Sequence, residues 1–132
     1  MVFTQSRSKA IVLVVEDDAL LRMLAVDFIE EAGFEVLEAE NADLAVAILE
    51  ARTDIRIVFT DIDMPGSMDG MKLAAAVRDR WPPIEIVIVS GHPRHLDIEL
   101  PARAVFFSKP YNADAVAAVL RQMQFHTENR AN

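Results

Sequence analysis

The chain has 132 residues, of which 52% are hydrophobic, and its formal net charge at neutral pH is −8. This length suits one domain with a single buried core. The negative charge argues against a nucleic-acid-binding surface, which needs a basic patch to neutralise phosphates. No apolar run reaches the roughly 18 residues of a membrane span, and residues 1–9 lack a signal-peptide core, so we expect no membrane partner. The absence of cysteine excludes disulfides and thiolate metal sites and favours a cytoplasmic location.

The first elements of the chain are predicted to be a buried strand and a helix. Residues 11–15 form an uninterrupted apolar run, rich in β-branched side chains, that is typical of a strand buried on both faces. Residues 18–32 then carry apolar side chains at helical spacing, and Gly33 supplies a stop. The inward-facing residues of this helix are expected to be Leu21, Leu24, Ala25, Phe28 and Ile29.

The second and third units follow the same alternation. Residues 34–39 predict a strand near an edge of the sheet, because the segment carries charge. Asn41 is expected to cap a helix over 42–52. The inward residues of that helix are expected to be Leu44, Ala45, Ile48 and Leu49. Residues 56–60 predict the third strand, and a loop rich in proline and glycine follows at 64–70.

The last units are predicted from a helix at 70–81, a strand at 84–89 and a strand at 104–108. Segment 91–103 carries a proline near each end, so its helix is expected to be short or irregular. Residues 112–124 predict a final helix. The inward residues of this helix are expected to be Ala113, Val116, Ala117, Leu120 and Met123.

Five successive strand–helix units indicate an α/β fold with a doubly wound, five-stranded parallel sheet of the flavodoxin-like type. We expect one domain over residues 10–125 and flexible ends at 1–9 and 126–132. In such sheets the carboxyl ends of the strands share one edge, where ligands bind.

Four charged residues stand at these strand ends. Glu16 and Asp17 follow the first apolar run, Asp61 ends the third, and Lys109 ends the fifth. Three acids and one lysine would then converge on one pocket. That combination suits a hard divalent cation together with a phosphoryl group.

The residues at these strand ends resemble the receiver domain of two-component response regulators over about residues 10–125. The segments that carry the resemblance are Val15-Glu16-Asp17-Asp18, Asp61-Ile62-Asp63-Met64-Pro65 through Asp69-Gly70, Ser90-Gly91 and Lys109-Pro110. Four such elements in the right order, each at a strand end, make the match specific.

The resemblance implies that Asp61 accepts a phosphoryl group from the phosphohistidine of a partner kinase. It also implies that Mg²⁺, or Mn²⁺, is held by Glu16, Asp17 and Asp61, with the backbone carbonyl of Asp63 as a further ligand. A cation is needed because a carboxylate attacks phosphorus poorly unless the charge on the phosphoryl oxygens is neutralised. Asp18, by contrast, is expected only to cap a helix.

Further roles are implied by the resemblance. Lys109 would pair with Asp61 at rest and with a phosphoryl oxygen afterwards, and Ser90 would donate to another phosphoryl oxygen. Asp63 and His92 would tune the lifetime of the acyl phosphate, or be merely solvated loop residues. Phe106 stands where many receivers have tyrosine, and would act either as a switch residue or simply as a half-buried ring of a strand. The peptide bond before Pro110 is cis in the family, although sequence alone does not fix it.

Two departures from the family pattern bear on the metal site and on the partners. Glu16 stands where receivers often have aspartate, which should change metal affinity only modestly. The segment from Ser90 to Lys109 is shorter than in most receivers, and the stunted helix expected there puts the family's common dimer face in doubt. We therefore expect a monomer or weak homodimer.

Three functions remain open. The first is a stand-alone phosphoacceptor whose partners are a histidine kinase, a downstream protein and, in a relay, a histidine phosphotransfer protein. The second is a receiver fold that binds a partner without phosphorylation. The third is a phosphatase of the haloacid-dehalogenase class, suggested by Asp61-Ile62-Asp63, although there the Asp-x-Asp sequence would follow the first strand and not the third.

Overall fold

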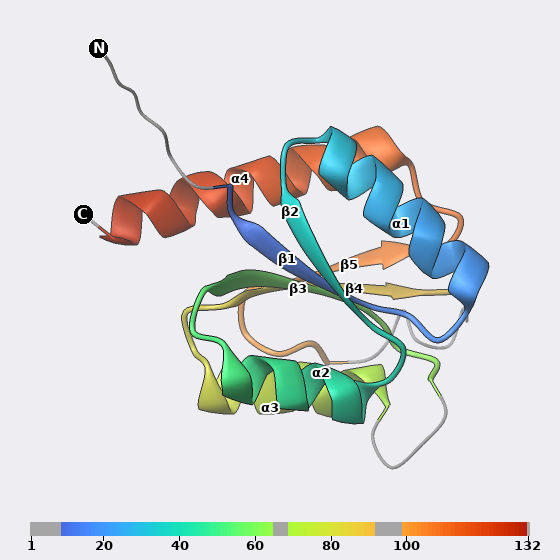
Figure 1. Ribbon diagram of the computed structural model, residues 1–132, viewed down its shortest axis with the longest axis horizontal. Coiled ribbons are helices and arrows are strands. Elements are labelled where there is room, and N and C mark those ends of the chain that lie inside the picture. Colours follow the sequence, from blue (N-terminus) through green and yellow to red (C-terminus); the bar gives the residue numbers. More distant parts are fainter. Residues whose placement is uncertain (1–8, 65–68, 92–98, 132) are drawn as a thin grey trace.

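A computed structural model describes residues 9–64, 69–91 and 99–131, with side chains described up to residue 125 (Figure 1). Strands and helices alternate along most of the chain. In order they are β1 (Ile11–Val15), α1 (Ala19–Glu31), β2 (Glu35–Ala39), α2 (Ala42–Ala51), β3 (Ile55–Asp61), α3 (Gly70–Arg80), β4 (Glu85–Ser90), β5 (Ala104–Ser108) and α4 (Ala113–Ala131).

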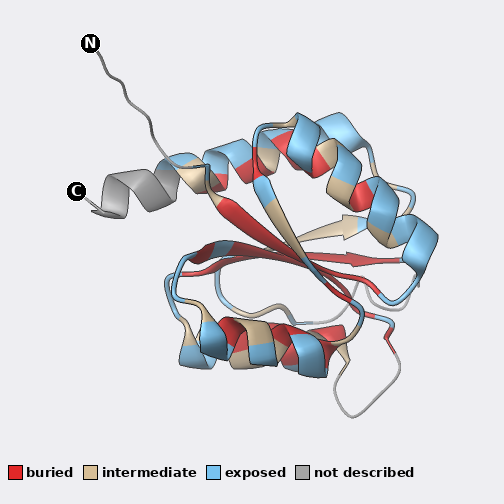
Figure 2. Ribbon diagram, in the orientation of Figure 1, coloured by how far each residue is buried: buried red, intermediate tan, exposed pale blue. Residues whose placement is uncertain are grey.

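The five strands form one parallel sheet in the order β2-β1-β3-β4-β5, which confirms the predicted doubly wound topology. β2 is an edge strand, as its charged residues indicated. Strands β1, β3 and β4 lie in the interior of the sheet and are almost entirely buried (Figure 2). The register pairs Val15 with Thr60 and Asp61 with Val89, so the ends of these three strands are aligned.

The helices cover both faces of the sheet, giving three layers (Figure 1). Helices α1 and α4 pack on one face through Ala25, Ile29, Val116 and Leu120. Helices α2 and α3 pack on the other through Ala45, Leu49, Leu73 and Val77. The two apolar cores pack against the strands on both faces of the sheet. This packing holds the side chains at the strand ends in place.

Local signals set the helix ends as expected. The carboxylate of Asp18 accepts a hydrogen bond from the backbone N–H of Leu21 at 3.0 Å, and the Asn41 side chain accepts one from Leu44 at 2.8 Å. Both residues are therefore the predicted N-caps. Gly33 follows the C-cap of α1 with a φ of 105°, a left-handed conformation that favours glycine.

Several predicted inward positions are wrong. Leu21 and Leu24 on α1 and Leu44 on α2 are exposed, as is Ala113 at the start of α4. In both α1 and α2 the buried stripe is narrower than the apolar stripe in the sequence. The sheet covers Ala25 and Ile29 of α1 but leaves an apolar strip of that helix facing outward.

The last helix also differs from its prediction. We expected it to end at 124, with a flexible tail after it, yet α4 continues to Ala131. No glycine or proline follows Pro110, so nothing in the sequence terminates the helix. Between β4 and β5, residues 91 and 99–103 are not helical; residues 92–98, where most of the short helix was expected, lie outside the described residues. Among the described residues, no helix is long and apolar enough to cross a membrane.

Candidate functional site

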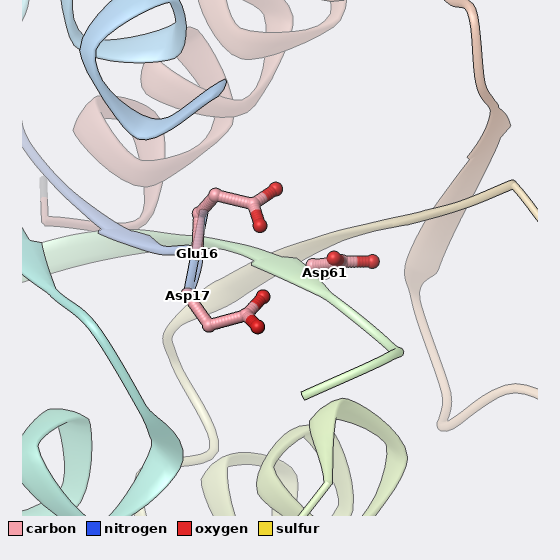
Figure 3. Close-up of side chains that lie close together, drawn as sticks. All are labelled: Glu16, Asp17 and Asp61. Atoms are coloured by element: carbon pink, nitrogen blue, oxygen red, sulfur yellow. The ribbon is translucent and has the colours of Figure 1, made fainter. Parts of the chain in front are cut away.

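The three acids predicted at the strand ends do converge. Glu16 and Asp17 project from the end of β1 toward Asp61 at the end of β3 (Figure 3). One carboxylate oxygen from each lies within 4.8 Å of the others. Asp61 and Glu16 are 4% and 5% exposed, whereas Asp17 faces solvent. The site is thus a cluster of oxygen ligands, two of them buried and one open to solvent.

Lys109 joins this cluster from the end of β5. Its ammonium Nζ donates to Asp61 Oδ2 at 3.2 Å and to Glu16 Oε1 at 3.3 Å. The backbone N–H of Lys109 donates to the Ser90 carbonyl at 2.8 Å, which fixes the lysine beside the end of β4. The Lys109–Pro110 peptide bond is cis, the isomer that the resemblance implied. The contact from Lys109 Nζ to Asp61 is the pair that the resemblance implied for the unphosphorylated protein.

The electrostatics of this cluster follow from the crowding of its charges. Burial, together with the nearby charge of Asp61, holds the pKa of Glu16 above its ordinary value, although Lys109 and the N–H of Asp18 oppose this. Burial acts to lower the pKa of Lys109, but the charges of Asp61 and Glu16 outweigh it and raise that pKa. The ammonium is thus held charged between the carboxylates of Asp61 and Glu16.

The backbone around Asp61 is fixed by close contacts with β4 and α3. The N–H of Ile62 donates to the carbonyl of Val89, and the N–H of Gly70 donates to the carbonyl of Ile62, both at 3.0 Å. A Cβ on Gly70 would lie 1.9 Å from the Asp61 carbonyl oxygen. Only glycine permits this approach, so α3 begins directly against the backbone of Asp61.

Ser90 lies at the end of β4 and is 1% exposed. Its hydroxyl donates to Asp63 Oδ2 at 3.2 Å, and the Asp63 N–H donates to Asp61 Oδ1 at 3.2 Å. Asp63 therefore contacts both Asp61 and Ser90. The sequence placed Ser90 and Asp63 at the same edge but gave no indication that they bond to each other.

Arg22 of α1 was missed by the sequence reasoning. Its Nη1 donates to the backbone carbonyl of Glu16 at 2.9 Å, and its Nε donates to Glu38 Oε1 at 3.1 Å. The guanidinium thus ties the acidic loop after β1 to α1 and β2. A charged residue on a helix ordinarily faces solvent, and only its closeness to the acidic pair could have drawn attention to it.

The aromatic residues near the site divide between the two faces of the sheet. Phe106 is half-buried and packs against the core beneath α2 and α3. Tyr111, just after Lys109-Pro110, packs with Phe28 and Phe59 at ring-centroid distances of 5.8 and 5.9 Å on the opposite face. Burial raises the pKa of the Tyr111 hydroxyl. This aromatic trio anchors the segment after Lys109 to the core. His92, for which a tuning role was expected, lies outside the described residues.

The donor set fits a hard divalent cation. All three converging ligands are carboxylates, Asp17 is open to solvent, and magnesium keeps some of its own waters when it binds. Burial is the main cause of the raised pKa of Glu16, and the charge of Asp61 adds to it; a cation would relieve this second effect. The adjacent ammonium of Lys109 can contact an anion placed on Asp61.

Comparison with known proteins identifies one family. The family model described as the response regulator receiver domain matches residues 12–121. The chain is 30% identical over 115 residues to the nitrogen assimilation regulatory protein NtrX of Azorhizobium caulinodans; that match covers 82% of this chain and 24% of NtrX. The chain thus spans about a quarter of that relative's length.

Solved structures agree with this finding. The receiver domain of NtrX from Brucella abortus is 30% identical and superposes with a TM-score of 0.76, covering 85% of this chain and 96% of that one. The response regulator protein TrrA from Thermotoga maritima was solved in complex with Mg²⁺-BeF. It superposes with a TM-score of 0.79 at 23% identity, covering 86% of this chain and 98% of TrrA. The second likeness bears on the fold alone.

Proposed function

This chain belongs to the response regulator receiver domain family of two-component signalling, and from that premise we propose that Asp61 is its phosphoacceptor. The observation that carries the proposal is the pair of contacts from Lys109 to Asp61 and Glu16 within the acidic cluster. Asp61 is the member of the cluster that ends a central strand, is buried, and has the ammonium beside it. These features distinguish it from Asp17, which is exposed.

The reaction transfers a phosphoryl group from a phosphohistidine to Asp61. A carboxylate oxygen forms the new bond to phosphorus, the bond from phosphorus to the histidine nitrogen breaks, and the imidazole takes a proton. Lys109 then moves its contact from the carboxylate to a phosphoryl oxygen, and Ser90 donates to another.

Magnesium is the cation we propose, held by Glu16, Asp17 and Asp61, with the Asp63 carbonyl as a further ligand. When bound it neutralises charge on the phosphoryl oxygens. Without it the cluster keeps a net negative charge beside the position of the incoming phosphate, because one lysine cannot balance three ionised acids. We therefore expect phosphorylation to depend on the cation.

A histidine kinase is the proposed donor, and its contact is proposed at the start of α1. This helix exposes Leu20, Met23 and Leu24 at 60%, 53% and 51%, and it begins directly after the acidic pair. A contiguous exposed apolar strip beside the acceptor pocket is suited to docking a partner protein. A histidine phosphotransfer protein could use the same strip. A cytoplasmic location remains a prediction.

Labelling with acetyl phosphate tests the proposal. The wild-type protein should incorporate phosphate only with Mg²⁺, and Asp61→Asn should abolish incorporation, whereas Asp54→Asn, an exposed acid paired with Arg52 away from the site, should not. Labelling that persists in Asp61→Asn would overturn the proposal. A protein that is never labelled would favour the alternative of a receiver used only as a binding module.

A further inference from the structure

The hydrogen bond between Ser90 and Asp63 sets a condition on phosphorylation. A serine hydroxyl has one hydrogen to donate. In this structure Ser90 Oγ directs it to Asp63 Oδ2 at 3.2 Å. The same hydrogen cannot at that moment be donated to an oxygen on Asp61.

Because the surrounding backbone is held by strand pairing, rotation of a side chain is the simplest way to break the hydrogen bond between Ser90 and Asp63. β3 and β4 are paired with Asp61 opposite Val89, and the Ser90 carbonyl accepts from the N–H of Lys109. Ser90 is almost completely buried at this strand end. Asp63, in contrast, is exposed and lies beyond the end of β3, so water can replace the hydrogen bond between its carboxylate and Ser90.

We propose that the Asp63 carboxylate holds the Ser90 hydroxyl in the resting protein and must release it before Ser90 can donate to a phosphoryl oxygen on Asp61. Asp63 is then a positioning residue that acts through Ser90. This inference rests on the proposed function, because it requires a phosphoryl group on Asp61. It differs from a direct effect of the Asp63 charge on the phosphate, which would need no serine.

Beryllofluoride separates these two effects, because it imitates a phosphoryl group on a carboxylate and its binding is an equilibrium. Its affinity is measured by ¹⁹F NMR at Mg²⁺ concentrations that saturate each variant. The variants are Asp63→Ala, Asp63→Asn, Ser90→Ala and the two double variants. Glu40→Gln removes the same charge from another exposed position at the carboxyl edge, just after β2, and is the matched control.

Asp63→Ala should tighten beryllofluoride binding more in the wild-type background than in the Ser90→Ala background. The ratio of the two gains should be about three- to tenfold, as expected for one hydrogen bond to a partly exposed charged group. Asp63→Asn should give a smaller ratio, because a neutral amide oxygen accepts a weaker bond. Glu40→Gln should show no such dependence on Ser90.

Equal gains in the two backgrounds would overturn the inference and leave a direct charge effect. An unchanged affinity in both would overturn it as well. A wild-type protein that binds no beryllofluoride would refute the proposed function itself, so the two failures are distinguishable. Thermal unfolding of each variant confirms that it is folded; if Asp63→Ala is not, the more conservative Asp63→Asn carries the test.

Discussion

Replacing Gly70 with alanine tests how closely α3 packs against the backbone of Asp61. The added Cβ would lie 1.9 Å from the Asp61 carbonyl oxygen and 2.6 Å from the Ile62 Cα. Favourable contacts between heavy atoms begin at about 3.5 Å, so the start of α3 and the loop must separate by about 1.5 Å. Both sides of the contact are backbone, and no side-chain rotation can relieve it.

The cost should be large for a single methyl group. Overpacking of this kind destabilises a protein by about 1–3 kcal/mol. The shift would also strain the bond from the Gly70 N–H to the Ile62 carbonyl, worth about 1 kcal/mol. Alanine favours a helix over glycine by about 1 kcal/mol, which offsets part of this loss. We expect a net loss of about 2 kcal/mol in the free energy of unfolding.

Urea unfolding measures the loss, and Gly91→Ala is its control. A Cβ on Gly91 would meet the Lys109 Cβ at 3.9 Å, an ordinary contact, so this variant should stay within about 0.5 kcal/mol of wild type. Gly70→Ala should also weaken Mg²⁺ binding, because the displaced backbone is that of Asp61. Equal midpoints for the two alanine variants would refute the argument.

Two further predictions concern the acidic cluster and the exposed strip of α1. Because burial raises the pKa of Glu16, its ionised form is disfavoured by folding, and stability falls as pH rises from the unfolded to the folded pKa of this group. Glu16→Gln should therefore be more stable than wild type at neutral pH without Mg²⁺, as measured by urea unfolding. This difference in stability should shrink on acidification. A Glu16→Gln variant that is less stable than wild type at neutral pH would contradict the prediction. Leu24→Glu should slow phosphotransfer from a histidine kinase severalfold but leave labelling by acetyl phosphate unchanged, whereas Leu44→Glu, equally non-conservative at a 45% exposed position on α2, should change neither. Equal slowing by both variants would place the kinase contact elsewhere.

The carboxyl edge of the sheet could be predicted because its signals are local. Each strand is a short apolar run, and each functional group directly follows one: Glu16 and Asp17 after β1, Asp61 at the end of β3, Lys109 after β5. Parallel pairing then brings the run ends together without any further information. The convergence of the acids needed only the topology.

The contacts that sequence reasoning missed are long-range or depend on backbone geometry. Arg22 reaches the Glu16 carbonyl across a helix end, and Ser90 at the end of β4 reaches Asp63 just past the end of the neighbouring strand β3. Gly70 was part of the recognised pattern, but its role rests on a backbone approach that no residue pattern specifies. These are contacts between particular atoms, which periodicity does not encode.

Helical periodicity overstated the core. Leu21 and Leu24 have the spacing of core residues, yet α1 turns a narrower face to the sheet and leaves them in solvent. The exposure of Leu24 fits the proposed docking strip, to which this residue belongs. The extent of α4 beyond 124 was missed because its last turns carry polar residues and lack an apolar stripe.

Chemical mapping of the phosphorylated residue tests directly whether Asp61 carries the phosphoryl group. The protein is labelled with acetyl phosphate and Mg²⁺ and then reduced with borohydride, which converts an aspartyl phosphate to homoserine. Peptide mass spectrometry should find homoserine at position 61 and unmodified aspartate at Asp17 and Asp63. Homoserine at either of those positions, or at none, would contradict the assignment.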